Sequence, residues 1–216
     1  MIYRSNVIGF SKVDEFNSSV TIYVSPTGND TTGYGTESRP FLTIDRAAKE
    51  AARYSSVQRV TIALMSGTYT GTVSFRSLCK RLTVRSDTNN ADDVIVDGTL
   101  SFTKGGQEIA VENITVHNNS MTISSCYEAS INGIKFTGTS AYGIDGDATY
   151  LLVQNCEFNN RTIYAIGCSR FMRCRNNSGS GNAIVHRCYG ILLRSGTVPS
   201  GSTLDSKLDG GQIFIG

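Results

Sequence analysis

Residues 109–116 (IAVENITV), 129–136 (ASINGIKF) and 151–158 (LLVQNCEF) share one hydrophobic pattern, with apolar side chains at the first, third, sixth and eighth positions. The three stretches begin 20 and 22 residues apart. Alternation with period two on both sides of a break indicates two short strands joined by a tight bend. A repeat of this length cannot bury its apolar face alone. We therefore predict that successive turns of the chain stack, with paired strands about 4.8 Å apart.

The repeat extends beyond these stretches, so equivalent side chains are predicted to form interior columns. The columns are Ile109, Ala129, Leu151, Phe171 and Ile191; Gly106, Cys126, Ala148, Cys168 and Cys188; Val111, Ile131 and Val153; Ile114, Ile134 and Cys156; and Val116, Phe136 and Phe158. The cysteines act there as small hydrophobic residues. Two positions do not fit. Arg173 falls where Val or Ile is expected, which indicates a shortened or slipped unit. Asp145 falls in the column of Ile123, Ala165 and Val185, which indicates either a re-aimed turn or a local misalignment.

Residues 44–54 carry the one convincing helix pattern. Thr43 is suited to the N-cap, Asp45 lies in the first turn, and small alanines form a narrow apolar stripe. Such a helix can cover the open edge of the first turn, which otherwise invites aggregation. The predicted fold is all-β: a single-stranded parallel β-helix of about six to seven coils with an N-terminal capping α-helix.

Composition narrows the classes of function. The chain has 216 residues, a net charge of +2 and 18% charged residues, which excludes a strongly basic nucleic-acid-binding protein. No apolar stretch is long enough to span a membrane, so no membrane insertion is expected. The first 20 residues contain no continuous apolar run and no cleavage site typical of a secretory signal. The six cysteines are therefore expected to stay reduced.

Asparagine pairs follow several of the predicted strands. They are Asn118 and Asn119, Asn159 and Asn160, and Asn176 and Asn177. Asparagine tolerates the left-handed backbone conformation that tight bends require. We predict bends at these pairs, with amide side chains hydrogen-bonded along the stack.

The first part of the chain resembles the start of pectate-lyase-like right-handed parallel β-helix proteins. The resemblance comprises Tyr23-Val24, Gly28-Asn29-Asp30, residues 40–44 (PFLTI) and Gly67-Thr68-Tyr69, and it continues in later units such as VQNCEF at 153–158. It covers about residues 21–195 and implies a right-handed helix. Within that superfamily, a short chain with an N-terminal arm and no signal peptide looks most like a bacteriophage tailspike or tail-fibre protein, which implies a homotrimer of rods.

Three segments are predicted on this basis. Residues 1–20 form an arm that attaches to other tail proteins of the virion, residues 21–195 form the β-helix with its capping helix, and residues 196–216 form a C-terminal cap or an oligomerisation tail. The protein is expected in the virion after synthesis in the host cytoplasm.

Carboxylates on the outer surface are the candidate catalytic groups. A glycosidase needs two carboxylates about 5–10 Å apart. Asp145 and Asp147 in the turn YGIDGD, together with Glu157 on the next strand, are the sharpest candidates for such a groove; Glu112 and Glu128 are further acids. The competing interpretation is that all five are solvated surface residues. There is no Trp for a sugar platform, although the 10 Tyr can serve that purpose.

Metal and nucleophile chemistry is not predicted. Asp92, Asp93 and Asp97 read as a turn followed by a strand, without a calcium-loop signature. Cys168, Cys174, His186 and Cys188 lack standard zinc spacing, and His117 and His186 have no evident nucleophile to activate. No metal and no cofactor are expected.

Three functions stay open from the sequence. The leading hypothesis is a tailspike-like or tail-fibre-like structural protein, non-enzymatic or weakly enzymatic, that binds a host cell-surface polysaccharide. The alternatives are a polysaccharide lyase or glycoside hydrolase on a β-helix, and a purely structural virion connector.

Overall fold

The computed structural model describes residues 19–54, 59–76, 79–103, 108–139, 142–159, 164–166, 171–180, 185–187, 191–195, 203–205 and 212–215. These residues form one α-helix, one short 3₁₀ helix and twenty strands. Short strands joined by tight turns dominate, since Thr favours strands and Ser and Asn favour the turns between them. The elements in chain order are β1 (Ser19–Val24), α1 (Ile44–Ala51), β2 (Arg59–Leu64), β3 (Gly67–Thr70), β4 (Val73–Phe75), β5 (Arg81–Ser86), η1 (Ala91–Asp93), β6 (Val94–Asp97), β7 (Leu100–Thr103), β8 (Glu108–Glu112), β9 (Thr115–His117), β10 (Met121–Asn132), β11 (Lys135–Thr137), β12 (Tyr142–Gln154), β13 (Glu157–Asn159), β14 (Tyr164–Ile166), β15 (Phe171–Arg175), β16 (Ser178–Ser180), β17 (Val185–Arg187), β18 (Ile191–Ser195), β19 (Thr203–Asp205) and β20 (Gln212–Ile215).

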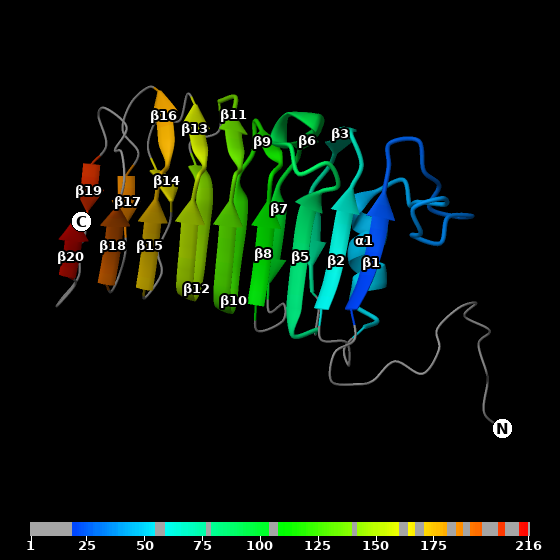
Figure 1. The fold of residues 1–216 in the computed structure, drawn as a ribbon, viewed down its shortest axis with the longest axis horizontal. Helices are drawn as coiled ribbons and strands as arrows, with labels where there is room; N and C mark the ends of the chain where they lie inside the picture. Colours follow the sequence, from blue (N-terminus) through cyan, green and yellow to red (C-terminus); the bar gives the residue numbers. More distant parts are fainter. Residues whose placement is uncertain are drawn as a thin grey trace.

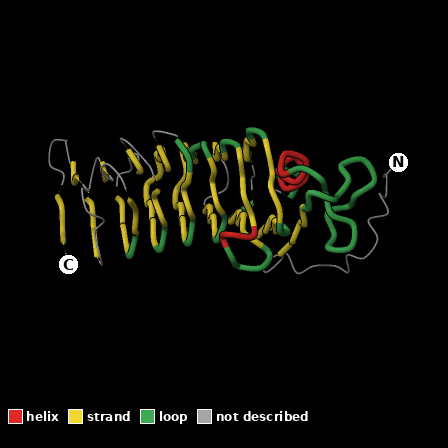
Figure 2. The backbone as a smooth tube through the Cα atoms, turned by 90° about the horizontal axis from the view of Figure 1, so that it is seen from above, coloured by secondary structure: helices red, strands yellow, loops and turns green. Residues whose placement is uncertain are grey.

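All the sheet ladders between these strands are parallel, and each strand lies beside its equivalent in the next turn of the chain. The order β1-β2-β5-β8-β10-β12 runs along one face of the larger sheet, and β15, β18 and β20 continue it. The smaller sheet has the order β16-β13-β11-β9-β6-β3. Figure 1 shows the strands in sequence order along the long axis, and Figure 2 shows the successive turns side by side. The fold is therefore all-β with parallel sheets, as predicted.

The larger sheet curls around the stack because two strands pass through a bend. The first part of β10 pairs with β7, whereas its second part pairs with β8. In the same way, β12 pairs with β14 through its first part and with β15 through its second part. The curled sheet and the smaller sheet thus surround one interior, an arrangement compatible with a β-helix.

The predicted interior columns are confirmed over the central turns. Ala129 pairs with Ile109 on one side and with Leu151 on the other, and all three are buried. Cys126 pairs with Ala148 in the same way. The aromatic columns stack: the rings of Phe136 and Phe158 lie 4.9 Å apart and nearly parallel. The remaining confirmed columns are Val111, Ile131 and Val153, and Val116, Phe136 and Phe158. Cys168 and Cys188, expected in the second column, lie outside the described residues.

The register differs from the prediction at the two positions that did not fit. Leu151 pairs with Met172 instead of Phe171, so the step is 21 residues rather than 20. This register leaves Arg173 exposed and places Cys174 in the interior opposite Val153. It is favoured because an unpaired charge in an apolar interior costs far more than a buried thiol.

A second shift moves Asp145 out of an interior column. Ile144, which is buried, pairs with Met121, and Asp145 pairs with the outward Thr122. The predicted alignment of Asp145 with Ile123 is therefore wrong by one residue, and the apolar neighbour takes the interior position. Ile163 and Ala183, which precede Ala165 and Val185 by two positions, lie outside the described residues.

Positive φ angles mark the same bend in four successive turns. Asn113 (54°), Gly133 (65°), Asn155 (53°) and Asn176 (51°) each follow a strand of the larger sheet directly. The Asn155 amide donates to the Asn132 side chain at 2.8 Å, and the Asn176 amide donates to Asn155 at 3.5 Å. Of the predicted asparagine bends, the one at Asn176 is confirmed, together with its stacked amide contact to Asn155. Asn113 and Asn155 are not among the predicted pairs, and Asn159 lies within β13 without a positive φ. Asn118 also has a positive φ.

Asn177 is a polar side chain in an interior column. It follows Ile114, Ile134 and Cys156 at the equivalent position and is buried. Its carbonyl oxygen accepts from the Cys156 backbone N–H at 3.0 Å, and its amide donates to the Val153 carbonyl at 3.1 Å. Both polar ends are thereby satisfied, which makes its burial possible.

The helix α1 covers the N-terminal end of the stack. The Thr43 hydroxyl accepts from the Arg46 backbone N–H at 3.1 Å, as the N-cap prediction requires. Ile44, Ala47 and Ala51 are buried, and α1 packs against β1, β2 and β4. Figure 2 shows α1 as the red coil at this end of the stack. The helix ends at Ala51, three residues earlier than predicted.

The ends of the chain extend the sheets. β1 begins at Ser19, inside the segment expected to be an arm, and residues 1–18 lie outside the described residues. In the C-terminal segment, β19 pairs with β17 and β20 pairs with β18, both in parallel. The roles of the two end segments in attachment and oligomerisation stay predictions.

We predict that Asn177→Ala lowers the free energy of unfolding by about 2 kcal/mol or more, because it leaves a buried N–H and a buried carbonyl unpaired. Urea denaturation of the purified protein measures this change. Asn176→Gly is the matched control: glycine accepts its positive φ, and the side chain is exposed. Equal stability of the Asn177→Ala variant and the control would contradict the interior role.

We predict that the thiols of Cys79, Cys126, Cys156 and Cys174 resist alkylation at pH 8 in the folded protein. All four are buried and unbridged, and burial raises the pKa of Cys156 to about 12. Iodoacetamide labelling followed by peptide mass mapping, with and without urea, measures this protection. Labelling of Cys156 in the folded state at the rate seen in urea would contradict it.

Candidate functional site

The outer surface of the smaller sheet carries polar side chains that are largely engaged with one another. Lys135 forms an ion pair with Asp92 at 2.5 Å. The His117 Nδ1 and the Thr137 hydroxyl share a hydrogen bond of 2.9 Å, and the Glu157 carboxylate accepts from the Asn159 amide. Each of these contacts joins two side chains that lie close together in space, and it stabilises the surface locally.

One part of the larger sheet presents rows of hydroxyl groups. Ser74, Ser101 and Thr122 are register partners on β4, β7 and β10, and their side chains are outward because their neighbours in the strand are buried. Thr103 and Ser124 form a second row. These short uncharged groups form a flat surface that can donate and accept hydrogen bonds at a spacing of about 4.8 Å.

Two of the three predicted catalytic residues, Asp145 and Asp147, lie on β12, the strand next to β10. Asp145 continues the first hydroxyl row as the partner of Thr122, and Asp147 continues the second as the partner of Ser124. The side chains of Asp145 and Asp147 lie outside the described set.

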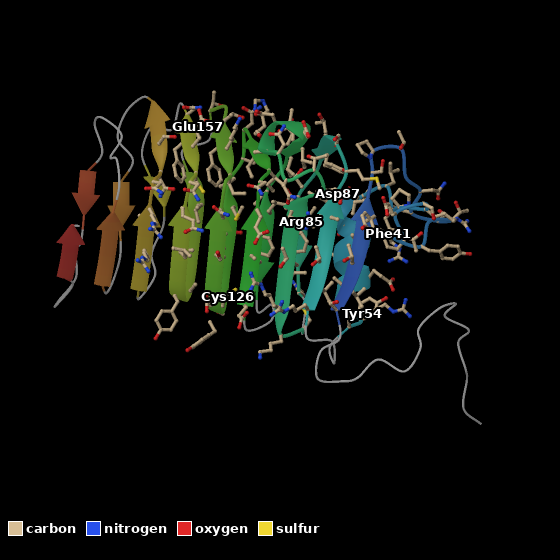
Figure 3. All side chains as sticks on the ribbon, in the orientation of Figure 1. Phe41, Tyr54, Arg85, Asp87, Cys126 and Glu157 are labelled. Atoms are coloured by element: carbon tan, nitrogen blue, oxygen red, sulfur yellow. The ribbon has the colours of Figure 1, made fainter. Side chains whose placement is uncertain are left out.

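Glu157 lies elsewhere. It is on β13 of the smaller sheet, between Lys135 and Ser178 in register. Asp147 precedes Ala148, which pairs with Cys126. Figure 3 shows Cys126 and Glu157 at opposite edges of the strands. The structure therefore does not bring Glu157 to the acids of β12, and a groove shared by all three stays a prediction.

The other candidate residues are distributed over the surface. Glu112 pairs in register with Arg85 and Asn132, and Glu128 pairs with Glu108 and Tyr150. Among the described residues, no group of His, Cys, Asp or Glu side chains is arranged to hold a metal ion. Of the residues weighed for zinc, Cys168 and Cys188 lie outside the described residues, and Cys174 is buried in the interior.

Two tyrosines on the larger sheet were not singled out by the sequence analysis. Tyr127 and Tyr150 have exposed side-chain fractions of 57% and 43%. The signal was present: Tyr127 follows the interior residue Cys126 directly, and Tyr150 precedes the interior residue Leu151, so alternation directs both outward.

Comparisons of the chain with protein-family models, with curated proteins and with solved structures find no match. Within the described part of the chain, no helix has the length and the apolar character needed to cross a membrane.

The described outer surface offers groups that can bind a polar ligand. Hydroxyl rows, scattered carboxylates and exposed tyrosines offer hydrogen bonds and ring contacts to a polar ligand that lies along the stack.

We predict that the purified protein does not cleave neutral or acidic polysaccharides above background, because Glu157 lies apart from Asp145 and Asp147. Release of reducing ends and formation of unsaturated uronate, followed over a day, measure this. Cleavage that Asp145→Asn abolishes would contradict the prediction and support the enzymatic alternative. Glu157→Gln is the matched control on the other sheet.

Proposed function

We propose that the chain is a right-handed parallel β-helix of about six to seven coils that acts as a bacteriophage tailspike-like or tail-fibre-like structural protein and binds a host cell-surface glycan. The observation that carries the proposal is the parallel register, which repeats every 20–22 residues through β8, β10 and β12. A stack built this way presents one long, regular outer surface.

The chemistry of that surface supports a glycan ligand. Sugars present many hydroxyl groups and one or more apolar ring faces, so they are recognised by hydroxyls, carboxylates, amides and aromatic rings. Ser101, Thr103, Thr122 and Ser124 supply such groups in rows, and Tyr127 and Tyr150 supply the rings. A net charge of +2 does not favour a polyanion such as nucleic acid.

The assembly is proposed to be a homotrimer with rods side by side, attached to other tail proteins through residues 1–20. This part of the proposal rests on the resemblance of residues 21–195 to β-helix proteins of the tailspike type. The stacked parallel sheets and the α1 cap at the N-terminal end are compatible with a rod whose other surfaces are available for association.

We predict that the purified full chain is a trimer and binds intact host cells or their purified surface polysaccharide. Native mass spectrometry measures the oligomeric state, and a glycan array with affinity electrophoresis measures binding. A stable monomer would contradict the spike assembly. A trimer that binds no glycan would contradict the glycan-binding role and favour a structural connector.

A further inference from the structure

Tyr127 and Tyr150 form an exposed aromatic pair on the larger sheet. Their ring centroids lie 5.4 Å apart at an interplanar angle of 71°, an edge-to-face arrangement. The large hydrophobic side chains that are exposed among the described residues are Tyr34, Leu42, Tyr127 and Tyr150. The two tyrosines contact each other across adjacent turns, and each keeps a substantial part of its side chain exposed.

A β-bulge lies in β10 just before Tyr127. The register of β10 against β12 shifts between Ser124 and Cys126, and Ser125 adopts a positive φ of 59°. Ser124 pairs with Asp147, and Glu128 pairs with Tyr150. Between these two pairs β10 advances by four residues, whereas β12 advances by three. The extra residue re-aims the outward side chains, as bulges next to binding sites commonly do. Holding a non-glycine residue in this conformation costs free energy, which the interior packing of Cys126 and Ala148 offsets.

Polar groups surround the pair on the same turns. Glu128, which is exposed, is directly opposite Tyr150 in register, and Ser124 is opposite Asp147 at the bend. The exposed Arg173 lies on the following turn, two positions from Phe171, the register partner of Tyr150. A carboxylate next to an aromatic face is suited to accept hydrogen bonds from neighbouring hydroxyls of a sugar whose apolar face rests on the ring.

We propose that Tyr127 and Tyr150 form a ring-stacking subsite for a neutral hexopyranose unit, with Glu128 accepting hydrogen bonds from its hydroxyls. This inference rests on the proposed glycan-binding function and assigns it a position. Adjacent sugar units extend from the bend along the hydroxyl rows of β7 and β10. Glu128, directly opposite Tyr150, disfavours a sugar that carries a carboxylate, because two like charges in contact repel.

The test compares Tyr127→Ala and Tyr150→Ala with the full-length protein and with Tyr34→Ala. Tyr34 is the matched control, because it is 69% exposed and lies under Arg39 in the loop before α1. Tyr127→Phe and Tyr150→Phe keep the ring and remove only the hydroxyl. The probes are cellohexaose, laminarihexaose, galactan, oligogalacturonate and the purified surface polysaccharide of the host. Affinity electrophoresis and saturation-transfer NMR measure binding, and circular dichroism and native mass spectrometry measure folding and assembly.

We predict that the protein binds at least one neutral probe more tightly than oligogalacturonate. Each alanine variant is expected to weaken that binding about tenfold, whereas both phenylalanine variants and Tyr34→Ala stay within about twofold. Ring protons of tyrosine are expected to transfer saturation to sugar C–H groups.

Unchanged affinity in both alanine variants, while the wild-type protein binds, overturns the subsite and leaves the proposed function intact. Loss of assembly in these variants also overturns the subsite, because the pair is then a contact between chains. Preference for oligogalacturonate overturns the neutral-sugar assignment. Absence of wild-type binding to every probe overturns the proposed function itself. If an alanine variant does not fold, weakened binding in the folded phenylalanine variants decides against ring stacking.

Discussion

Backbone hydrogen bonds between one turn of the chain and the next are the constraint on which the rest of the structure depends. At the bend, the Asn113 N–H donates to the Asn132 carbonyl, and the Gly133 N–H donates to the Gln154 carbonyl. Every turn therefore satisfies its polar groups only by lying in register with its neighbours. Register in turn decides which side chains face the interior, since a slip of one residue exchanges the two faces. The last strands at each end of such a stack leave backbone N–H and C=O groups unpaired. At the N-terminal end, α1 covers this edge.

The sequence predicts the fold well wherever an apolar residue stands alone at its position in the repeat. Ala129 and Ile131 alternate with polar neighbours, so their columns follow from spacing alone. The prediction of the register fails where two adjacent residues are both apolar and either one can take the interior position. Phe171 and Met172 are both apolar, and only the cost of burying Arg173 decides between them. The bends add or remove single residues without a strong sequence signal, so the step of 21 residues is not evident from the motif.

The candidate site is less predictable because outward residues do not determine the fold. Asp147 and Glu157 are outward in the sequence pattern, whereas Asp145 falls in an interior column, and the pattern does not say which sheet each residue joins across a bend. The bulge at Ser125 is equally hidden, because a serine with positive φ has no compositional signature. The bulge lies two residues before Tyr127, whose ring contacts the Tyr150 ring. The proposed binding site thus depends on small departures from a repeat whose regular part is fixed by the interior.

The most direct measurement of the central claim is a set of distances between spin labels along one outward column. In register, Thr61, Thr83, Ala110, Ser130, Leu152 and Arg173 lie on successive turns. All are at least partly exposed except Ala110, which is buried and is left unlabelled. With one label at Thr61 and the second at Ser130, Leu152 or Arg173, the account predicts backbone separations of about 14, 19 and 24 Å. Electron paramagnetic resonance on the three doubly labelled variants measures them. Separations that do not increase by a constant step would contradict the stacked register.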